Sequence, residues 1–154
     1  LSPRLVKVQA QTIRDALVQV DPEYRVTYDA NLQGLLKDID ALDAEIRAML
    51  ATKSRRRFIV FHPSWGYFAR DYGLEQIPVE VGGQEPSAAE LAELISLARE
   101  EGIRVILAQP EFSTQAAETI AREIDGKVVL ISPLAPDWLD NMRRLANALA
   151  QALE

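Results

Sequence analysis

The sequence predicts an α/β protein in which a four-stranded parallel sheet carries helices on both faces and is preceded by a long helix. Two patterns predict this fold. The first third of the chain places apolar residues every three or four positions, a spacing typical of amphipathic helices. The rest alternates short apolar runs with amphipathic segments, as in consecutive strand–helix units joined by right-handed crossovers. A chain of 154 residues is long enough to bury one sizeable core.

Two helix starts are visible before the first strand. The hydroxyl of Ser2 can cap free backbone amides, and Pro3 lacks the N–H that the first helical turn leaves unpaired. We therefore expect a helix over about residues 1–20. An Asp-Pro pair at residues 21–22 repeats the signal, and no proline interrupts the pattern before about Thr52. This second segment predicts one long helix.

The long helix is expected to extend beyond a compact domain. It would span about 45 Å at roughly 1.5 Å per residue, more than a domain of this size needs. Part of it should therefore project or bridge, and something else should cover its apolar stripe. A coiled-coil dimer is the alternative, although the stripe is broader than two positions per heptad. The stripe consists of Leu32, Leu35, Leu36, Ile39, Leu42, Ile46, Met49 and Leu50.

The strand–helix units follow in residues 58–154. A capping box between Ser87 and Glu90 marks one helix start, and glycines close two of the helices. The expected strands cover residues 58–61, 77–81, 105–108 and 128–131, and the expected helices cover residues 65–72, 87–101, 113–124 and 137–153.

Charge and composition exclude several classes of protein. A net charge of -6 argues against binding to nucleic acid, and the one basic cluster, residues 53–57, is placed to stabilise the end of the long helix. The absence of cysteine excludes disulfides, a thiol nucleophile and cysteine-ligated zinc. No apolar run is long enough to cross a bilayer. Because the chain starts with Leu1 and already reads as a helix start, we expect a fragment.

Two sets of conspicuous side chains are assigned to structure. The aromatic residues of the short third helix are expected to pack in the core. The carboxylates of the long helix and Asp71 are expected on solvated helix faces. These residues are Trp65, Tyr67, Phe68 and Tyr72, and Asp38, Asp40, Asp43, Glu45 and Asp71.

The candidate functional residues follow the ends of the expected strands. In parallel sheets with helices on both faces, ligands bind beyond the carboxyl ends of the strands. The polar side chains expected there are His62, Gln109, Glu111 and Ser132. His62 is the only histidine of the chain.

Three chemical roles are open for His62. The first role is structural: an imidazole at the end of a strand that forms a hydrogen bond with a neighbouring loop. The residues alone favour this structural role. A hydrolase with His62 as general base lacks a convincing partner, because Ser64 lies too close in sequence and lacks the pair of flanking glycines of a nucleophile elbow. A metal site is the third role. Since zinc takes three or four ligands, one imidazole with a few oxygens would form only half a site.

Five segments of the sequence resemble a known family in order along the chain. They read LSPRLVKVQAQTIRDAL, DPEYRVTYDANLQGLLKDIDALDAEI, FIVFHPSWGYFARDYGL, GGQEPSAAEL and PLAPDWLDNM. Together they resemble the second half of the periplasmic solute-binding proteins of zinc and manganese ABC transporters, the ZnuA/TroA-like family. The likeness covers essentially the whole chain.

The resemblance implies a division of the chain and a role for each part. It implies that residues 1–20 are a helix from the edge of a missing N-terminal lobe, that residues 21–57 form the linking helix, and that residues 58–154 form the C-terminal lobe. In this family the metal lies between the two lobes. His62 would be the histidine that the C-terminal lobe gives to the metal, and two more would come from the missing lobe.

At one position the sequence departs from the pattern of this family. Ser132 stands where the family usually has an aspartate ligand, and a hydroxyl is a poorer ligand for a dication than a carboxylate. Three histidines and water would then hold the metal, or Glu111 would substitute. Between lining the cleft and binding the metal, the lining role is the one expected for both Gln109 and Glu111.

We therefore expect an exported, periplasmic or extracytoplasmic binding protein that delivers Zn²⁺, with Mn²⁺ as the alternative, to an ABC permease and catalyses no reaction. The chain alone should bind metal weakly. Binding should weaken below about pH 6, since protonation blocks imidazole ligation. Two other hypotheses remain: a module that forms a homodimer through the long helix, and a small α/β hydrolase that uses His62.

Overall fold

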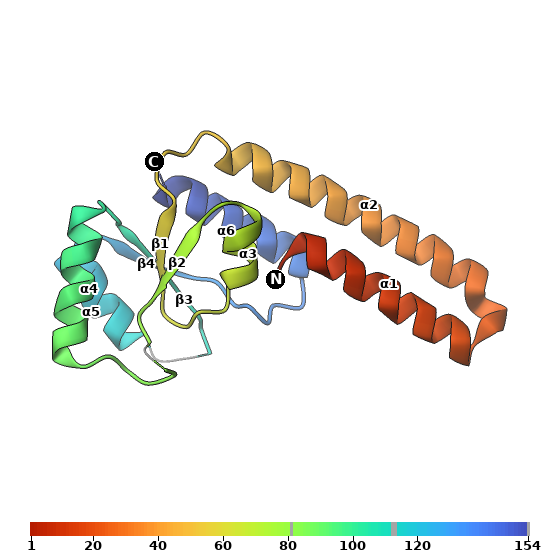
Figure 1. Ribbon diagram of the computed structural model, residues 1–154, viewed down its shortest axis with the longest axis horizontal. Helices are drawn as coiled ribbons and strands as arrows, with labels where there is room; N and C mark the ends of the chain where they lie inside the picture. Colours follow the sequence, from red (N-terminus) through yellow and green to blue (C-terminus); the bar gives the residue numbers. More distant parts are fainter. Residues whose placement is uncertain (81, 112–113, 154) are drawn as a thin grey trace.

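The computed structural model describes residues 1–80, 82–111 and 114–153, and it consists of a helical hairpin that projects from an α/β lobe (Figure 1). The hairpin is formed by helix α1 (Pro3–Val20), the 3-10 turn η1 (Pro22–Tyr24) and helix α2 (Arg25–Leu50). The predicted long helix is thus confirmed, but its first turn is a separate 3-10 turn, because the chain reverses direction at Asp21 and Pro22.

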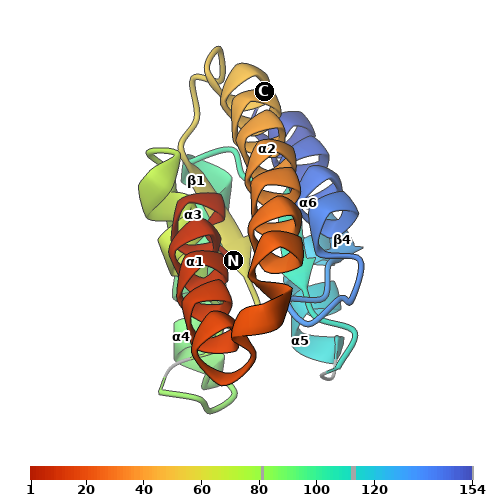
Figure 2. The same ribbon diagram turned by 90° about the vertical axis from the view of Figure 1, so that its right-hand side faces the viewer.

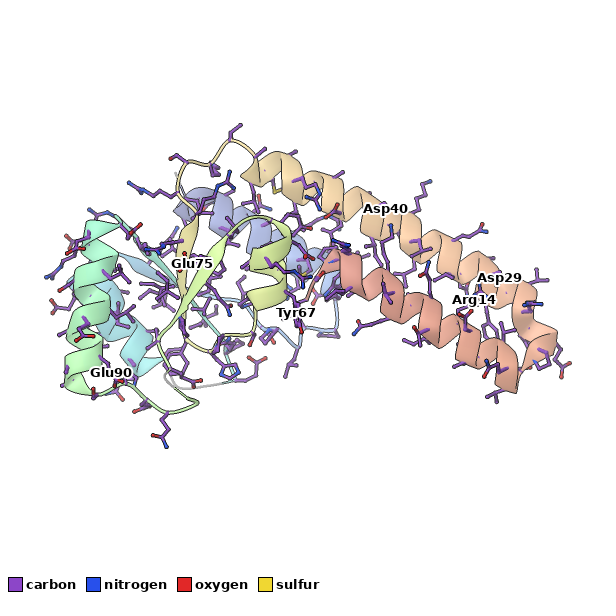
Figure 3. All side chains as sticks on the ribbon, viewed as in Figure 1. Arg14, Asp29, Asp40, Tyr67, Glu75 and Glu90 are labelled. Carbon is purple, nitrogen blue, oxygen red and sulfur yellow. The ribbon has the colours of Figure 1, made fainter. Side chains whose placement is uncertain are left out.

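Ion pairs link the two helices of the hairpin along its length. Near the lobe, Nζ of Lys7 lies 2.5 Å from a carboxylate oxygen of Asp40. Further out, Nε of Arg14 lies 3.3 Å from a carboxylate oxygen of Asp29, and Figure 3 shows these two side chains facing each other between the helices. The side chains of both pairs are partly exposed, so each pair adds little stability.

The lobe is built on a four-stranded parallel sheet with the strand order β2-β1-β3-β4. Its strands are β1 (Arg57–Val60), β2 (Glu75–Pro78), β3 (Val105–Ala108) and β4 (Lys127–Leu130). The sequence predicted β2 at residues 77–81. Residue 81 lies outside the described residues, and over the described ones both bounds of this prediction were wrong. The strand starts earlier because it pairs with β1 from Glu75 onward, and it ends at Pro78, which has no N–H to donate.

Helices cover both faces of the sheet, as predicted. Helices α3 (Gly66–Asp71) and α6 (Trp138–Ala152) pack on one face with the inner half of α2, and Figure 2 shows α6 beside α2. Helices α4 (Ala88–Glu100) and α5 (Gln115–Glu123) pack on the other. Within β1, Phe58 and Val60 enter the first core while Ile59 enters the second, as the alternation of a strand requires. The predicted helix at 113–124 matches α5, apart from Ser113, which lies outside the described residues.

Most of the structural assignments of side chains are correct. Of the four aromatic residues around α3, three are buried, but Tyr67 is 62 % exposed and only stacks under the guanidinium of Arg70. In the basic cluster, Arg56 donates a hydrogen bond to the carbonyl of Leu50 in the last turn of α2, as expected of a residue at a helix C-terminus. None of the described helices is both long and apolar enough to cross a membrane.

Two carboxylates depart from the solvated positions expected for them. Asp43 of α2 accepts a hydrogen bond of 2.7 Å from the hydroxyl of Tyr72, so it ties the hairpin to the end of α3. Burial first, and this hydrogen bond second, raise the pKa of Tyr72. The side chain of Asp71 is only 5 % exposed. The remaining carboxylates of α2 that were expected to be solvated, Asp38, Asp40 and Glu45, are exposed.

Asp71 is buried because it anchors the start of α1. It accepts a hydrogen bond from the hydroxyl of Ser2, whose oxygen in turn caps α1 by accepting from the N–H of Leu5 at 3.1 Å. Burial alone would raise the pKa of Asp71, but the hydrogen bonds from Ser2 and Arg70 outweigh it and hold the pKa below its usual value. The negative charge of Asp71 therefore stabilises the fold.

We expect Asp71→Asn to lower the free energy of unfolding by about 1–3 kcal/mol at neutral pH, because Ser2 loses a charged acceptor. The lowered pKa means that this stabilisation is present above about pH 4 and is lost as the pH falls through the folded-state value. The difference between the two proteins should therefore shrink below about pH 4. Urea unfolding followed by circular dichroism over a pH series measures it. Asp38→Asn, at an exposed position of α2, is the control, and an equal loss in both variants would contradict the anchor.

Candidate functional site

The switch point of the sheet lies between β1 and β3. The chain leaves β1 towards α3 on one face and leaves β3 towards α5 on the other, although the two strands are neighbours. At such a point the connections diverge beyond the strand ends and leave room for a ligand. His62 follows β1 and Gln109 follows β3. Two of the four predicted site residues therefore meet at this point.

The register of the strands places a third residue beside them. Val60 is paired with Pro78 of β2 and with Leu107 of β3. Continuing both registers by two residues sets Glu80 on one side of His62 and Gln109 on the other. Backbone pairing does continue, since the N–H of Glu80 donates to the carbonyl of Phe61 at 3.1 Å.

The carboxylate of Glu80 binds the imidazole of His62. Nδ1 of His62 lies 2.6 Å from a carboxylate oxygen of Glu80. The side chain of His62 is 42 % exposed, whereas that of Glu80 is 11 % exposed. The carboxylate is thus more buried than the imidazole, and the ring reaches the surface.

The amide of Gln109 holds the backbone of His62 from the opposite side. Its oxygen accepts from the His62 N–H at 3.3 Å, and its nitrogen donates to the His62 carbonyl at 2.9 Å. The same nitrogen lies 3.4 Å from the hydroxyl of Ser64. Since Gln109 is only 1 % exposed, it acts as a buried clamp on the strand end rather than as part of a cleft surface.

Glu111 and Ser132 form a separate pair at the ends of β3 and β4. The hydroxyl of Ser132 donates to a carboxylate oxygen of Glu111 and accepts from the N–H of Leu134 at 3.1 Å. Its carbonyl accepts from the buried amide of Asn141 in α6 at 2.7 Å. Asn141 of α6 therefore holds the backbone of Ser132, and the carboxylate of Glu111 lies beside the Ser132 hydroxyl.

The described part of the chain does not form a complete metal site by itself. Within residues 1–80, 82–111 and 114–153, no group of three or more histidine, cysteine, aspartate or glutamate side chains is placed to hold a metal ion. A transition-metal site needs three or four such ligands. The edge offers one imidazole, with the carboxylate of Glu80 beside it.

Sequence reasoning missed Glu80 because of the error in β2. With the strand placed at residues 77–81, Glu80 lies inside it instead of beyond its end. A strand ending at Pro78 would have put Glu80 at the same level as His62. The proline was therefore the signal for this residue.

A doubly wound lobe that presents a histidine at its switch point has the features of an α/β ligand-binding protein. The comparisons with known proteins agree. The family model for the zinc-uptake complex component A, periplasmic, matches residues 1–152. The chain belongs to this family of zinc ABC transporter solute-binding proteins, which are not enzymes.

Individual relatives support the same assignment. The chain is 33 % identical over 136 residues to the high-affinity zinc uptake system protein ZnuA of Bacillus subtilis, covering 87 % of this chain and 43 % of that protein. It is 28 % identical over 151 residues to a putative metal-binding protein of Chlamydia trachomatis, covering 97 % and 55 % of the two chains.

Solved structures agree over nearly the whole chain. A crystal structure of ZnuA superposes with a TM-score of 0.97 at 48 % identity and covers 99 % of this chain and 58 % of the other. A ZnuA deletion mutant with zinc bound gives a TM-score of 0.94 with the same identity, covering 99 % and 59 %. The chain thus spans about half the length of the curated relatives and somewhat more of the solved ones.

We expect Gln109→Leu to destabilise the lobe by about 1–3 kcal/mol for each polar group of His62 left unpaired, because a leucine fills the space but bonds neither. The midpoint of urea unfolding gives the size of the loss. Gln33→Leu makes the same change at an exposed position of α2 and should cost less than about 0.5 kcal/mol. Equal midpoints for the two variants would refute the clamp.

Proposed function

We propose that this chain is the C-terminal lobe and linking helix of an exported binding protein that holds Zn²⁺ and delivers it to an ABC permease. His62 is its metal ligand, with Nε2 as the coordinating atom. The observation that carries the proposal is the exposed ring of His62 at the switch point, with its Nδ1 engaged by a carboxylate. Metal-binding histidines typically have this arrangement.

The choice of zinc over manganese rests on the donor atoms and the relatives. An imidazole is a usual ligand for zinc, whereas Mn²⁺ prefers oxygen donors. One similar structure, the ZnuA deletion mutant, contains zinc. Mn²⁺ remains the alternative cargo, and Glu111 the residue that would add an oxygen ligand.

The hairpin supplies the second argument, because it has an apolar groove that nothing in the described residues fills. The groove has a volume of about 420 Å³ and runs between α1 and α2. Its apolar walls include Ile13, Leu17 and Leu35, all exposed. We propose that an N-terminal lobe of a longer protein covers this groove and brings the remaining metal ligands, with residues 1–20 at its edge, residues 21–57 linking the lobes and residues 58–154 forming the second lobe.

We expect His62→Ala to lower the zinc affinity of the longer protein at least about 100-fold, since the site loses one of three or four ligands. The chain alone should bind zinc weakly with either residue. Competition with a chromophoric chelator measures both affinities. Glu93→Ala, on the exposed side of α4, is the matched control, and an unchanged affinity in His62→Ala would reject His62 as a ligand.

A second candidate function is a module that dimerises through the hairpin, which the same exposed groove favours. Ile13→Glu separates the two, because Ile13 lines the groove and is 60 % exposed. We expect the longer protein to sediment as a monomer and to lose about 1–2 kcal/mol of stability with this change, while the chain alone loses none.

Val8→Glu is the control for that experiment, because Val8 lies on the other side of α1 and is also exposed. Sedimentation velocity and thermal unfolding are measured on both lengths of protein. If the longer protein is a dimer that Ile13→Glu splits and Val8→Glu does not, the dimerisation module is the better description.

A further inference from the structure

We infer that Glu80 is a positioning residue for the metal ligand. Its carboxylate accepts a hydrogen bond from the Nδ1–H of His62 and thereby sets the tautomer and direction of the ring, so that Nε2 meets the metal. The inference rests on the proposed function, since it assigns the residue that prepares His62 for binding. It concerns a glutamate that the sequence analysis did not include among the candidate site residues.

The geometry of the pair supports this role. The distance of 2.6 Å between Nδ1 and the carboxylate is short for an N–H···O hydrogen bond, and a charged acceptor shortens such bonds. A neutral imidazole has one ring nitrogen with a proton and one with a lone pair. A carboxylate at Nδ1 stabilises the tautomer with its proton there, which places the lone pair on Nε2.

The backbone keeps Glu80 in place. The N–H of Val79 donates to the carbonyl of Val60 at 2.8 Å, and the N–H of Glu80 donates to that of Phe61 at 3.1 Å. Val79 is buried in the core on the α4 and α5 side of the sheet, so it anchors the residue before Glu80. The carboxylate is therefore attached to the sheet itself and not to a loose loop.

The two sides of His62 are fixed by different kinds of contact. Gln109 holds its main chain, as described above, and Glu80 holds its ring. Because Gln109 clamps the backbone and not the ring, loss of Glu80 should leave the strand end in place while it removes the hydrogen bond at Nδ1. This separation makes the role of Glu80 testable without unfolding the lobe.

The single histidine allows a direct measurement. In the chain grown with ¹⁵N-labelled histidine and kept free of metal, every imidazole signal comes from His62, and the ¹⁵N shifts distinguish the two tautomers. We expect the form with the proton on Nδ1 to predominate at neutral pH in the unaltered chain and in the control Glu93→Gln. In Glu80→Ala the population of this form should fall at least about twofold.

The second measurement is zinc affinity in the longer protein. Glu80→Ala should weaken it about 10- to 100-fold, the usual effect of removing a hydrogen-bond partner of a metal ligand, while Glu93→Gln leaves it unchanged. If Glu80→Ala does not fold, Glu80→Gln takes its place. It keeps the size of the side chain but offers a weaker, neutral acceptor, so both effects should be smaller and in the same direction.

The outcomes separate this inference from the proposed function. If His62→Ala weakens zinc binding but Glu80→Ala does not, or if the tautomer is the same with and without Glu80, the positioning role is wrong and the proposed function stands. If neither His62→Ala nor Glu80→Ala changes the affinity, the proposed function fails together with the inference. A shifted tautomer combined with a weakened affinity supports both.

Discussion

The parallel pairing of β1 with both of its neighbours is the constraint on which the rest of the site depends. Because β1 lies between β2 and β3 in the sheet, whatever follows it is flanked on both sides. The register then sets Glu80, His62 and Gln109 at one level. A slip of one residue in either pairing would turn the neighbouring side chain to the other face of the sheet. The arrangement of side chains at this edge of the sheet therefore depends on backbone hydrogen bonding as much as on the types of residue present.

Much of the fold could be predicted from the sequence because its signals are local. The Ser2 cap, the long apolar stripe and the alternation of strands and helices are all readable within a few residues, and they give the hairpin, the parallel sheet and the two helical layers. The exceptions depend on partners far along the chain. Asp71 carries no local sign of its bond to Ser2, and the exact start of β2 depends on its pairing with β1.

The same distinction applies to the candidate site. Rules about strand ends bring His62, Gln109, Glu111 and Ser132 to one edge of the sheet, as the structure shows. They do not give the contacts of these residues, since a side chain that holds the backbone and one that reaches the surface look alike in a sequence. Gln109 is turned to the backbone, and Ser132 is already bonded to Glu111. Glu80 could be found only from a register, which no single segment contains.

The attachment of α3 to both helices of the hairpin has a mechanical consequence. Asp71 holds the start of α1 through Ser2, and Tyr72 holds the inner half of α2 through Asp43. The hairpin therefore cannot tilt relative to the lobe without breaking one of these bonds. A force applied to the outer turn of the hairpin would therefore be transmitted to α3, which directly follows the loop that carries His62.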